Sequence, residues 1–446
     1  MDHNLIIYSL LLALAYAVVK LWNYIFNPYP ELKDIPTISF VDIIMSMLKR
    51  ETTLERKRRL YAPAMKEKGI AKVWHAGNWH ILVSRPEMAR QILLRSDRAV
   101  DLDRFTLQRK FFGQTNLFHS EGDNWRRHRK VVNPAFHRSW STQPFGEVTV
   151  SLFKQIDKLD GKHIPMEDLM KRLTLDALGK IAFNFEFHAL DDQLGKYAVA
   201  WEQIRNGLSQ ILFQLFPWLD IFAFLIPSRK KMNEAMKDMD ELLYRIIEEK
   251  RTEIQNGKYH SADTQDVDLL ALMIEATDAE DPMLTKKELR DNLAMFFFVG
   301  HETTQISLSI AVYYLAVNSD IQQRAREEVE RILGPGEKRD MVPTIEDVKK
   351  MEYIMMVIKE SMRLQPIAHT IARRRVVKPT EISGHVIPTG ALVGVDVWGI
   401  HHDPQLYDDH DPSRFWPERF APDEKAAMHT YQWLAFGGGP RQCRWC

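Results

Sequence analysis

The residues best suited to chemistry lie near the C-terminal end of the sequence. The segment 437–440 contains three glycines and a proline, which predicts a tight loop with few side chains that can lie flat against a planar group. Cys443 follows this loop, and Arg441 supplies positive charge that favours its thiolate over its thiol. Phe436 adds an aromatic edge. A thiolate beside a flat backbone surface is suited to ligating a metal ion held in a planar ring.

The cysteine pattern leaves another interpretation open. Cys443 and Cys446 are the two cysteines of the chain, so a disulfide framework is excluded and a reducing compartment is indicated. Their C-x-x-C spacing also matches half of a zinc site or a redox-active dithiol. A zinc site needs two more ligands, and a thioredoxin-like dithiol should open a helix after a strand. A metal or dithiol protein using both cysteines therefore stays as an alternative.

One long predicted helix also contains residues that could take part in chemistry. Thr285 and Glu288 have the spacing of a capping box, and the helix that follows should span roughly 48 Å and be buried, because both flanks are apolar all round. In its middle, Gly300 leaves room for a ligand at the backbone, Thr303 offers a hydroxyl, and Glu302 is an acid that can pass protons. The alternative is that Thr303 bonds back to a helix carbonyl and bends the helix.

Two further pairs of residues lie on predicted helices. Trp125 and Arg129 are four residues apart and share one helix face, whereas Glu360 and Arg363 are three residues apart. An arginine guanidinium is suited to binding carboxylates. Taken alone, each pair is more typical of a solvated helix than of a functional site.

Short β-rich segments complete the predicted elements. Residues 72–74 and 79–84 predict a hairpin, and 371–377 and 392–397 predict two further strands. The segment 97–119 has weak periodicity and predicts a long loop over a site.

The N-terminal segment 1–26 is predicted to be a single membrane-anchor helix. It is almost continuously apolar and reaches the roughly 20 residues that cross a bilayer when its aromatic end is included. Lys20, Trp22 and Tyr24 are typical of a membrane interface. The positively charged start and cleavage site of a signal peptide are missing, and a buried core helix is the other alternative. The prolines of 27–50 predict a hinge and linker.

Composition excludes some classes of partner. The 446 residues are enough for one large core or several smaller ones, and 45% of them are hydrophobic. Lysine plus arginine and aspartate plus glutamate each number 60, so the formal net charge is zero. We therefore expect no nucleic-acid partner.

The cysteine loop closely resembles that of the cytochrome P450 monooxygenases, whose pattern is F-x-x-G-x-R-x-C-x-G. Phe436, Gly439, Arg441 and Cys443 match this pattern, and Trp445 replaces its final glycine. Four other motifs of the family occur upstream in the family's order: W-x-x-x-R, a G-x-E-T match to the oxygen-activation motif, E-x-x-R and P-E-R-F. Together they extend the resemblance from the anchor to Cys443.

The resemblance implies a cofactor and residues that bind it. The cofactor is haem b (iron protoporphyrin IX), with the Cys443 thiolate as the axial ligand of its iron. Trp125 and Arg129 are implied to hold the haem propionates. One of three consecutive arginines is expected to join them, and we select Arg373 by its distance from Pro366. Phe436, Gly300 and Arg441 are expected to lie beside the haem.

The resemblance also implies the fold and the activity. The fold is mainly α with a small β region (α+β), in which Glu360, Arg363 and Arg419 form a buried charge network behind the loop. Glu302 and Thr303 are implied to guide protons. An NADPH-dependent reductase would deliver electrons, and one atom of dioxygen would enter a hydrophobic substrate. The location implied is the endoplasmic reticulum membrane, with the catalytic domain on the cytoplasmic side.

The implied haem domain covers 51–446 and is expected to be truncated just after the ligand. Family members continue past the cysteine into a long helix and a terminal β hairpin, which this sequence does not contain. Loss of a core helix exposes apolar surface and leaves the ligand loop on a terminus. The alternative function is therefore a non-catalytic, membrane-anchored remnant with impaired haem binding.

Overall fold

The computed structural model describes most of the chain. Described residues run from 3 to 443, except for 27, 76–77, 95–98, 101–106, 137–139, 160, 162, 192–194, 258–267, 337–340 and 408–409.

Helices form most of the structure. The α-helices are α1 (His3–Phe26), α2 (Phe40–Leu48), α3 (Thr53–Arg56), α4 (Ala62–Met65), α5 (Pro86–Leu93), α6 (Leu107–Phe112), α7 (Gly122–Phe136), α8 (Gln143–Asp157), α9 (Met166–Leu178), α10 (Lys196–Leu208), α11 (Ile211–Leu215), α12 (Pro227–Gln255), α13 (Leu269–Asp278), α14 (Lys286–Val317), α15 (Ser319–Leu333), α16 (Ile345–Lys350), α17 (Glu352–Leu364), α18 (Val397–His401) and α19 (Pro422–Ala427). Shorter π and 3-10 turns are η1 (Lys57–Tyr61), η2 (Gly179–Phe183), η3 (Pro217–Leu225), η4 (Pro404–Leu406), η5 (Pro417–Phe420) and η6 (Gly439–Arg441).

The strands form one mixed sheet and one separate hairpin. The strands are β1 (Ile70–His75), β2 (Asn78–Val83), β3 (Ala99–Val100), β4 (Thr370–Arg375), β5 (Thr380–Ile382), β6 (His385–Ile387) and β7 (Leu392–Asp396). The sheet order is β1-β2-β7-β4-β3, in which β2 and β7 are parallel and the other pairs antiparallel, and β5 pairs with β6. The structure is therefore mainly helical with a small sheet, as the sequence predicts.

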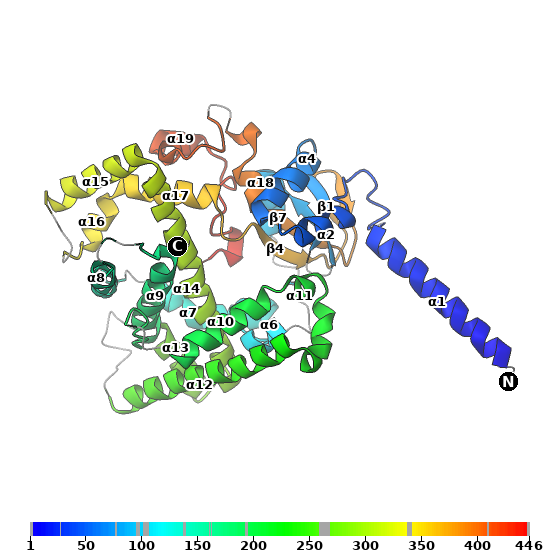
Figure 1. Ribbon diagram of the computed structural model, residues 1–446, viewed down its shortest axis with the longest axis horizontal. Helices are drawn as coiled ribbons and strands as arrows, with labels where there is room; N and C mark the ends of the chain where they lie inside the picture. The colour runs from blue at the N-terminus through cyan, green and yellow to red at the C-terminus, as the bar shows by residue number, and fades with distance from the viewer. Residues whose placement is uncertain are drawn as a thin grey trace.

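Most of the helices lie on one side of the molecule, whereas the sheet lies on the other with α2, α4 and α18 beside it (Figure 1), and each side has its own core. The larger core lies among α6, α7, α9, α10, α12, α13 and α14, and α14 runs through this helical part. The smaller core packs the sheet against α5 and α18. Helix α14 begins where predicted, because Thr285 and Glu288 form both hydrogen bonds of the capping box.

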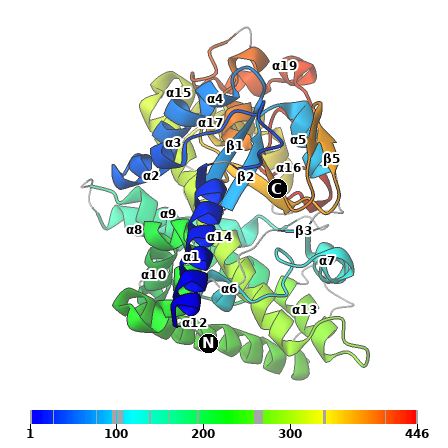
Figure 2. The same cartoon turned by 90° about the vertical axis from the view of Figure 1, so that its right-hand side faces the viewer.

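The N-terminal helix projects away from both parts (Figure 1) and lies in front of them in the view of Figure 2. It ends at Phe26, just before the predicted hinge, and its side chains Leu12 and Trp22 are 72% and 63% exposed. Within the described residues, no helix is at once long enough and apolar enough to span a bilayer. Residues of the predicted linker, among them Ile35 and Ile38, pack into the domain and are buried.

The predicted loop 97–119 is partly helical. Part of it lies outside the described residues, but α6 occupies Leu107–Phe112. Phe111 and Phe112 are fully buried in the larger core, and this tertiary packing stabilises a helix that weak local periodicity did not predict.

Candidate functional site

The cysteine loop is closed by a hydrogen bond between its ends. The backbone N–H of Cys443 donates to the carbonyl of Phe436 at 3.0 Å. Gly439 has a left-handed φ of 72°, and a Cβ atom there would lie 2.6 Å from the carbonyl oxygen of Leu93 at the end of α5. Only glycine allows the loop to lie this close to α5. Cys443 itself is a half-buried thiol.

A buried charge network connects α17 and η5. Glu360 and Arg363 form a bidentate ion pair with N–O distances of 2.7 and 2.9 Å, and both are fully buried. Arg419 approaches the same carboxylate at 3.5 Å, and the backbone N–H of Trp416 donates to it at 3.0 Å. The structure thus brings together the three residues predicted for this network. Such a network specifies geometry more than it adds stability.

His401 connects this network to the cysteine loop. Its Nε2 accepts a hydrogen bond from the backbone N–H of Leu434 at 2.8 Å, and its Nδ1 lies 3.1 Å from the carbonyl oxygen of Arg363. Because Nε2 is the acceptor, Nδ1 carries the proton and donates to that carbonyl. Burial, together with the charge of Arg363, holds the pKa of His401 well below its usual value, so the ring is neutral. Sequence reasoning missed this residue because no local pattern indicates either partner.

Three arginines from different elements gather near Trp125 on α7. The guanidinium of Arg129 lies 6.0 Å from the indole centroid and that of Arg441 lies 4.7 Å from it. Arg374 of β4 is buried close by, and its charge acts on Arg441. Burial and the neighbouring Arg374 lower the pKa of Arg441 to about 10, while Glu121 opposes this shift. The cluster therefore holds more positive than negative charge.

This cluster fits the carboxylates of a haem group. Arg129 Nη2 and Arg374 Nε are buried without a hydrogen-bond partner among the described residues, and so is Ser120 Oγ. Buried donors of this kind are costly when unpaired. Two propionates would supply the acceptors and the negative charge that they lack. The nearby thiol of Cys443 is a ligand type that haem iron accepts.

The structure places Arg374, rather than the predicted Arg373, in this cluster. The pairing of β4 with β7 shifts register, and Ala372 takes a left-handed φ of 53°. This bulge inserts one residue, which reverses the faces of the sheet that the following side chains present. The charge of Arg373 instead acts on His75 and His80 of the neighbouring hairpin.

Two of the three residues singled out on α14, Gly300 and Thr303, make contacts that differ from the predicted roles. A Cβ atom at Gly300 would lie 2.6 Å from Cδ1 of Leu178, so this glycine allows α9 and α14 to pack closely, and the predicted ligand space is occupied by Leu178. Thr303 Oγ1 donates to the carbonyl of Val299 at 2.6 Å, as in the local back-bonding alternative.

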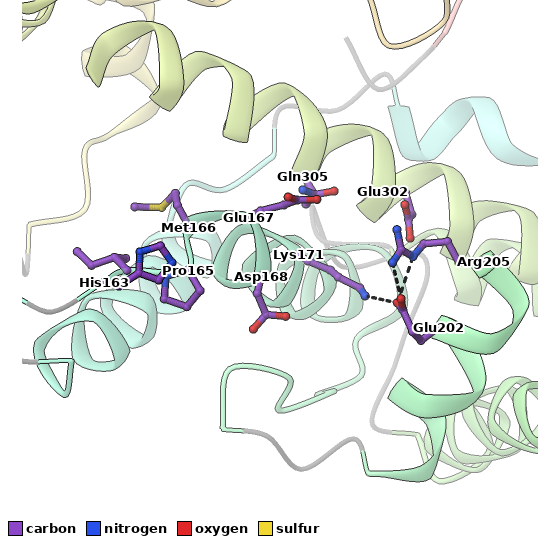
Figure 3. Close-up of a pocket in the computed structure, with 11 residues that line it drawn as sticks. His163, Pro165, Met166, Glu167, Asp168, Lys171, Glu202, Arg205, Glu302 and Gln305 are labelled. Atoms are coloured by element: carbon purple, nitrogen blue, oxygen red, sulfur yellow. Dashed lines mark hydrogen bonds and ion pairs between the residues drawn. The ribbon is translucent and has the colours of Figure 1, made fainter. Parts of the chain in front are cut away.

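Glu302 lies on the wall of a pocket between α9, α10 and α14 (Figure 3). The pocket has a volume of about 610 Å³. The indole Nε1–H of Trp201 donates to Oε1 of Glu302 at 2.8 Å. The other polar residues of the wall include Glu167, Asp168, Lys171, Glu202, Arg205 and Gln305. Trp201 is a second residue that sequence reasoning missed.

The zinc or dithiol alternative finds no support in the part of the chain that the structure covers. Within those residues, no group of three or more histidine, cysteine, aspartate or glutamate side chains is placed to hold a metal ion. Cys446, the other half of the predicted pair, lies outside the described residues.

Comparisons with known proteins agree with the motifs. The family model described as Cytochrome P450 matches residues 36–444. The chain is 30% identical over 382 residues to Cytochrome P450 3A29 of Sus scrofa. This alignment covers 81% of this chain and 72% of that protein. It is 26% identical to Cytochrome P450 4F3 of Homo sapiens, covering 83% and 73%. It is 28% identical to Protein LUTEIN DEFICIENT 5, chloroplastic, of Arabidopsis thaliana, covering 84% of this chain and 63% of that protein's length.

Proposed function

This chain belongs to the cytochrome P450 family, and on that premise we propose that it is a haem-thiolate monooxygenase. Its substrates would be dioxygen and a hydrophobic small molecule, and its electrons would come from NADPH through a reductase. The observation that carries this proposal is the position of the Cys443 loop beside a cluster of buried arginine donors without acceptors.

The residues of the site have separate roles in haem binding and in proton transfer. The thiolate of Cys443 would hold the haem iron, and the guanidinium groups of Arg129, Arg374 and Arg441 would hold and orient the propionates. Bound haem supplies oxygen activation and one-electron transfer. Glu302 is the acid that takes up protons, and Thr303 offers its hydroxyl after release from the carbonyl of Val299.

We also propose that α1 attaches the chain to the endoplasmic reticulum membrane, with the catalytic domain on the cytoplasmic side. Support comes from the exposed apolar side chains of α1 and from Trp22 near its end. Removal of residues 1–26 should release the expressed chain from microsomes into the soluble fraction after a carbonate wash. Equal retention of both forms would contradict this proposal.

The test of the activity is the carbon-monoxide difference spectrum of the reduced, purified chain. A thiolate-type Soret band supports haem-thiolate ligation, and Cys443→Ala should abolish it whereas Cys446→Ala should retain it. Equal loss in both variants would favour the dithiol alternative. Absence of the band and of bound haem in the unmodified chain would favour the non-catalytic remnant.

A pair of adjacent variants tests the arginine cluster. Arg374→Gln should weaken haem affinity about 10-fold or more, because a lost hydrogen bond to a charged group costs roughly 1.5–3 kcal/mol. Arg373→Gln is the matched control and should change the affinity less than about twofold. The opposite order, measured by titrating the haem-free chain with haem, would support Arg373 as the propionate ligand.

A further inference from the structure

Trp201 and Glu302 join two helices through one directional contact. The indole Nε1–H on α10 donates to the carboxylate on α14 at 2.8 Å, although the residues are 101 positions apart in sequence. Trp201 is 3% exposed, whereas the side chain of Glu302 retains 16% exposure. An indole N–H donates and never accepts, and it binds an ionised carboxylate more strongly than a neutral one.

Aromatic packing holds the indole in place. Its ring centroid lies 5.3 Å from that of Phe297, 5.6 Å from Phe298 and 5.4 Å from His301. Burial lowers the pKa of His301 to about 4, so this ring, 3.9 Å from Glu302, is neutral near pH 7. The indole therefore provides a fixed, uncharged donor to Glu302.

Three charged residues of the pocket wall form ion pairs with one another. Glu202 pairs with Arg205 and, at 3.3 Å, with Lys171. The hydrogen bond from Arg205 lowers the pKa of Glu202 to about 2, so Glu202 stays ionised and does not carry protons near pH 7. Arg205 also lies beside Glu302 (Figure 3), and the charge of Glu302 acts on it. From α9, Glu167 faces the same pocket.

We propose that Trp201 is a positioning residue, which holds the carboxylate of Glu302 at the pocket wall where Glu302 exchanges its proton with water. Each proton that Glu302 passes on is then replaced from water in the pocket between α9, α10 and α14. The use of these protons in catalysis rests on the proposed function, whereas the hydrogen bond does not.

The first measurement concerns the hydrogen bond and needs no activity. In the chain labelled with ¹⁵N-tryptophan, Trp201→Phe assigns the indole resonance of Trp201. Glu302→Gln should shift this resonance, because the carboxylate acceptor is lost, whereas Glu202→Gln should leave it unchanged. A Trp201 resonance that is the same in the Glu302→Gln variant as in the unmodified chain would overturn the proposal.

The second measurement concerns turnover. Trp201→Phe keeps the aromatic packing but removes the donor, so kcat should fall about 10-fold while KM changes less than about twofold. Trp218→Phe is the matched control, since Trp218 is 53% exposed on η3, and this variant should leave kcat and KM unchanged.

The two measurements separate failure of this proposal from failure of the proposed function. An unchanged kcat in an active Trp201→Phe variant would overturn the proton role and leave the monooxygenase function intact. An unmodified chain that binds haem but shows no turnover with any substrate would overturn the function and the proton role together, while the indole resonance of Trp201 would still report the hydrogen bond.

Discussion

The imidazole of His401 accepts a hydrogen bond from the backbone N–H of Leu434, and this contact joins the buried charge network to the loop that carries Cys443. Since the other ring nitrogen faces the carbonyl of Arg363, a neutral histidine satisfies one buried donor and one buried acceptor at once. The position of the ligand loop therefore depends on a residue outside every motif that indicates the family.

Replacing His401 by phenylalanine should destabilise the loop. The N–H of Leu434 and the carbonyl of Arg363 would remain buried without partners, which should lower the free energy of unfolding by about 2 kcal/mol. Urea denaturation measures this loss, and the carbon-monoxide spectrum should lose its thiolate band. His402→Phe is the control, because His402 contacts the carbonyl of Trp398 instead. Retention of both stability and the band in His401→Phe would contradict the assignment.

Breaking the buried ion pair of Glu360 and Arg363 should lower the free energy of unfolding far more than breaking an exposed ion pair of equal spacing. Glu360→Ala leaves Arg363 charged and buried, and should lower the free energy of unfolding by about 3–5 kcal/mol. Glu346 and Lys349 have the same i,i+3 spacing but are 67% and 64% exposed, so Glu346→Ala should cost less than about 0.5 kcal/mol. Similar losses in both variants, measured by urea denaturation, would show that Glu360 is not buried as the structure places it.

Gly300→Ala should destabilise the contact between α9 and α14. The added methyl group would meet Cδ1 of Leu178, and overpacking of this kind costs about 1–3 kcal/mol. Leu178→Ala removes that contact, so the double variant should be more stable than the sum of the two single losses predicts. Strictly additive losses in thermal or urea unfolding would contradict the packing role of Gly300.

Stability should fall as pH decreases below about 6.5. Burial is the main cause that lowers the pKa of His80 and His402 to about 3 and that of His301 to about 4 from an ordinary value of 6.5. Between these values the unfolded chain binds protons that the folded chain excludes, so the free energy of unfolding decreases with falling pH. Each such histidine contributes a slope that approaches about 1.4 kcal/mol per pH unit.

Denaturation with urea at several pH values between 7.5 and 4.5 checks this slope. His402→Gln should make this slope smaller, because the unfolded chain then has one less histidine that binds a proton. We attribute this slope to histidines. Carboxylates with lowered pKa values, such as Glu202 at about 2, lose their contribution to the free energy of unfolding only below about pH 4.5. Constant stability across the range would contradict the burial of these rings.

The sequence by itself determined the elements that depend on local spacing. The capping box of Thr285 and Glu288 requires residues three positions apart, and the pairing of Glu360 with Arg363 is a contact between adjacent helical turns. Motif order then indicated the family and the thiol of Cys443. These inferences depend on distances of a few residues along the chain, so a single sequence is sufficient for them.

Tertiary structure decided which side chains meet across the fold. A bulge at Ala372 brings Arg374 rather than Arg373 to Arg441, and a register shift of one residue has no reliable signal in a run of three arginines. Leu178 occupies the space beside Gly300, and Trp201 reaches Glu302 from another helix. Each of these contacts depends on how two elements distant in sequence pack together, and local spacing contains no record of that packing.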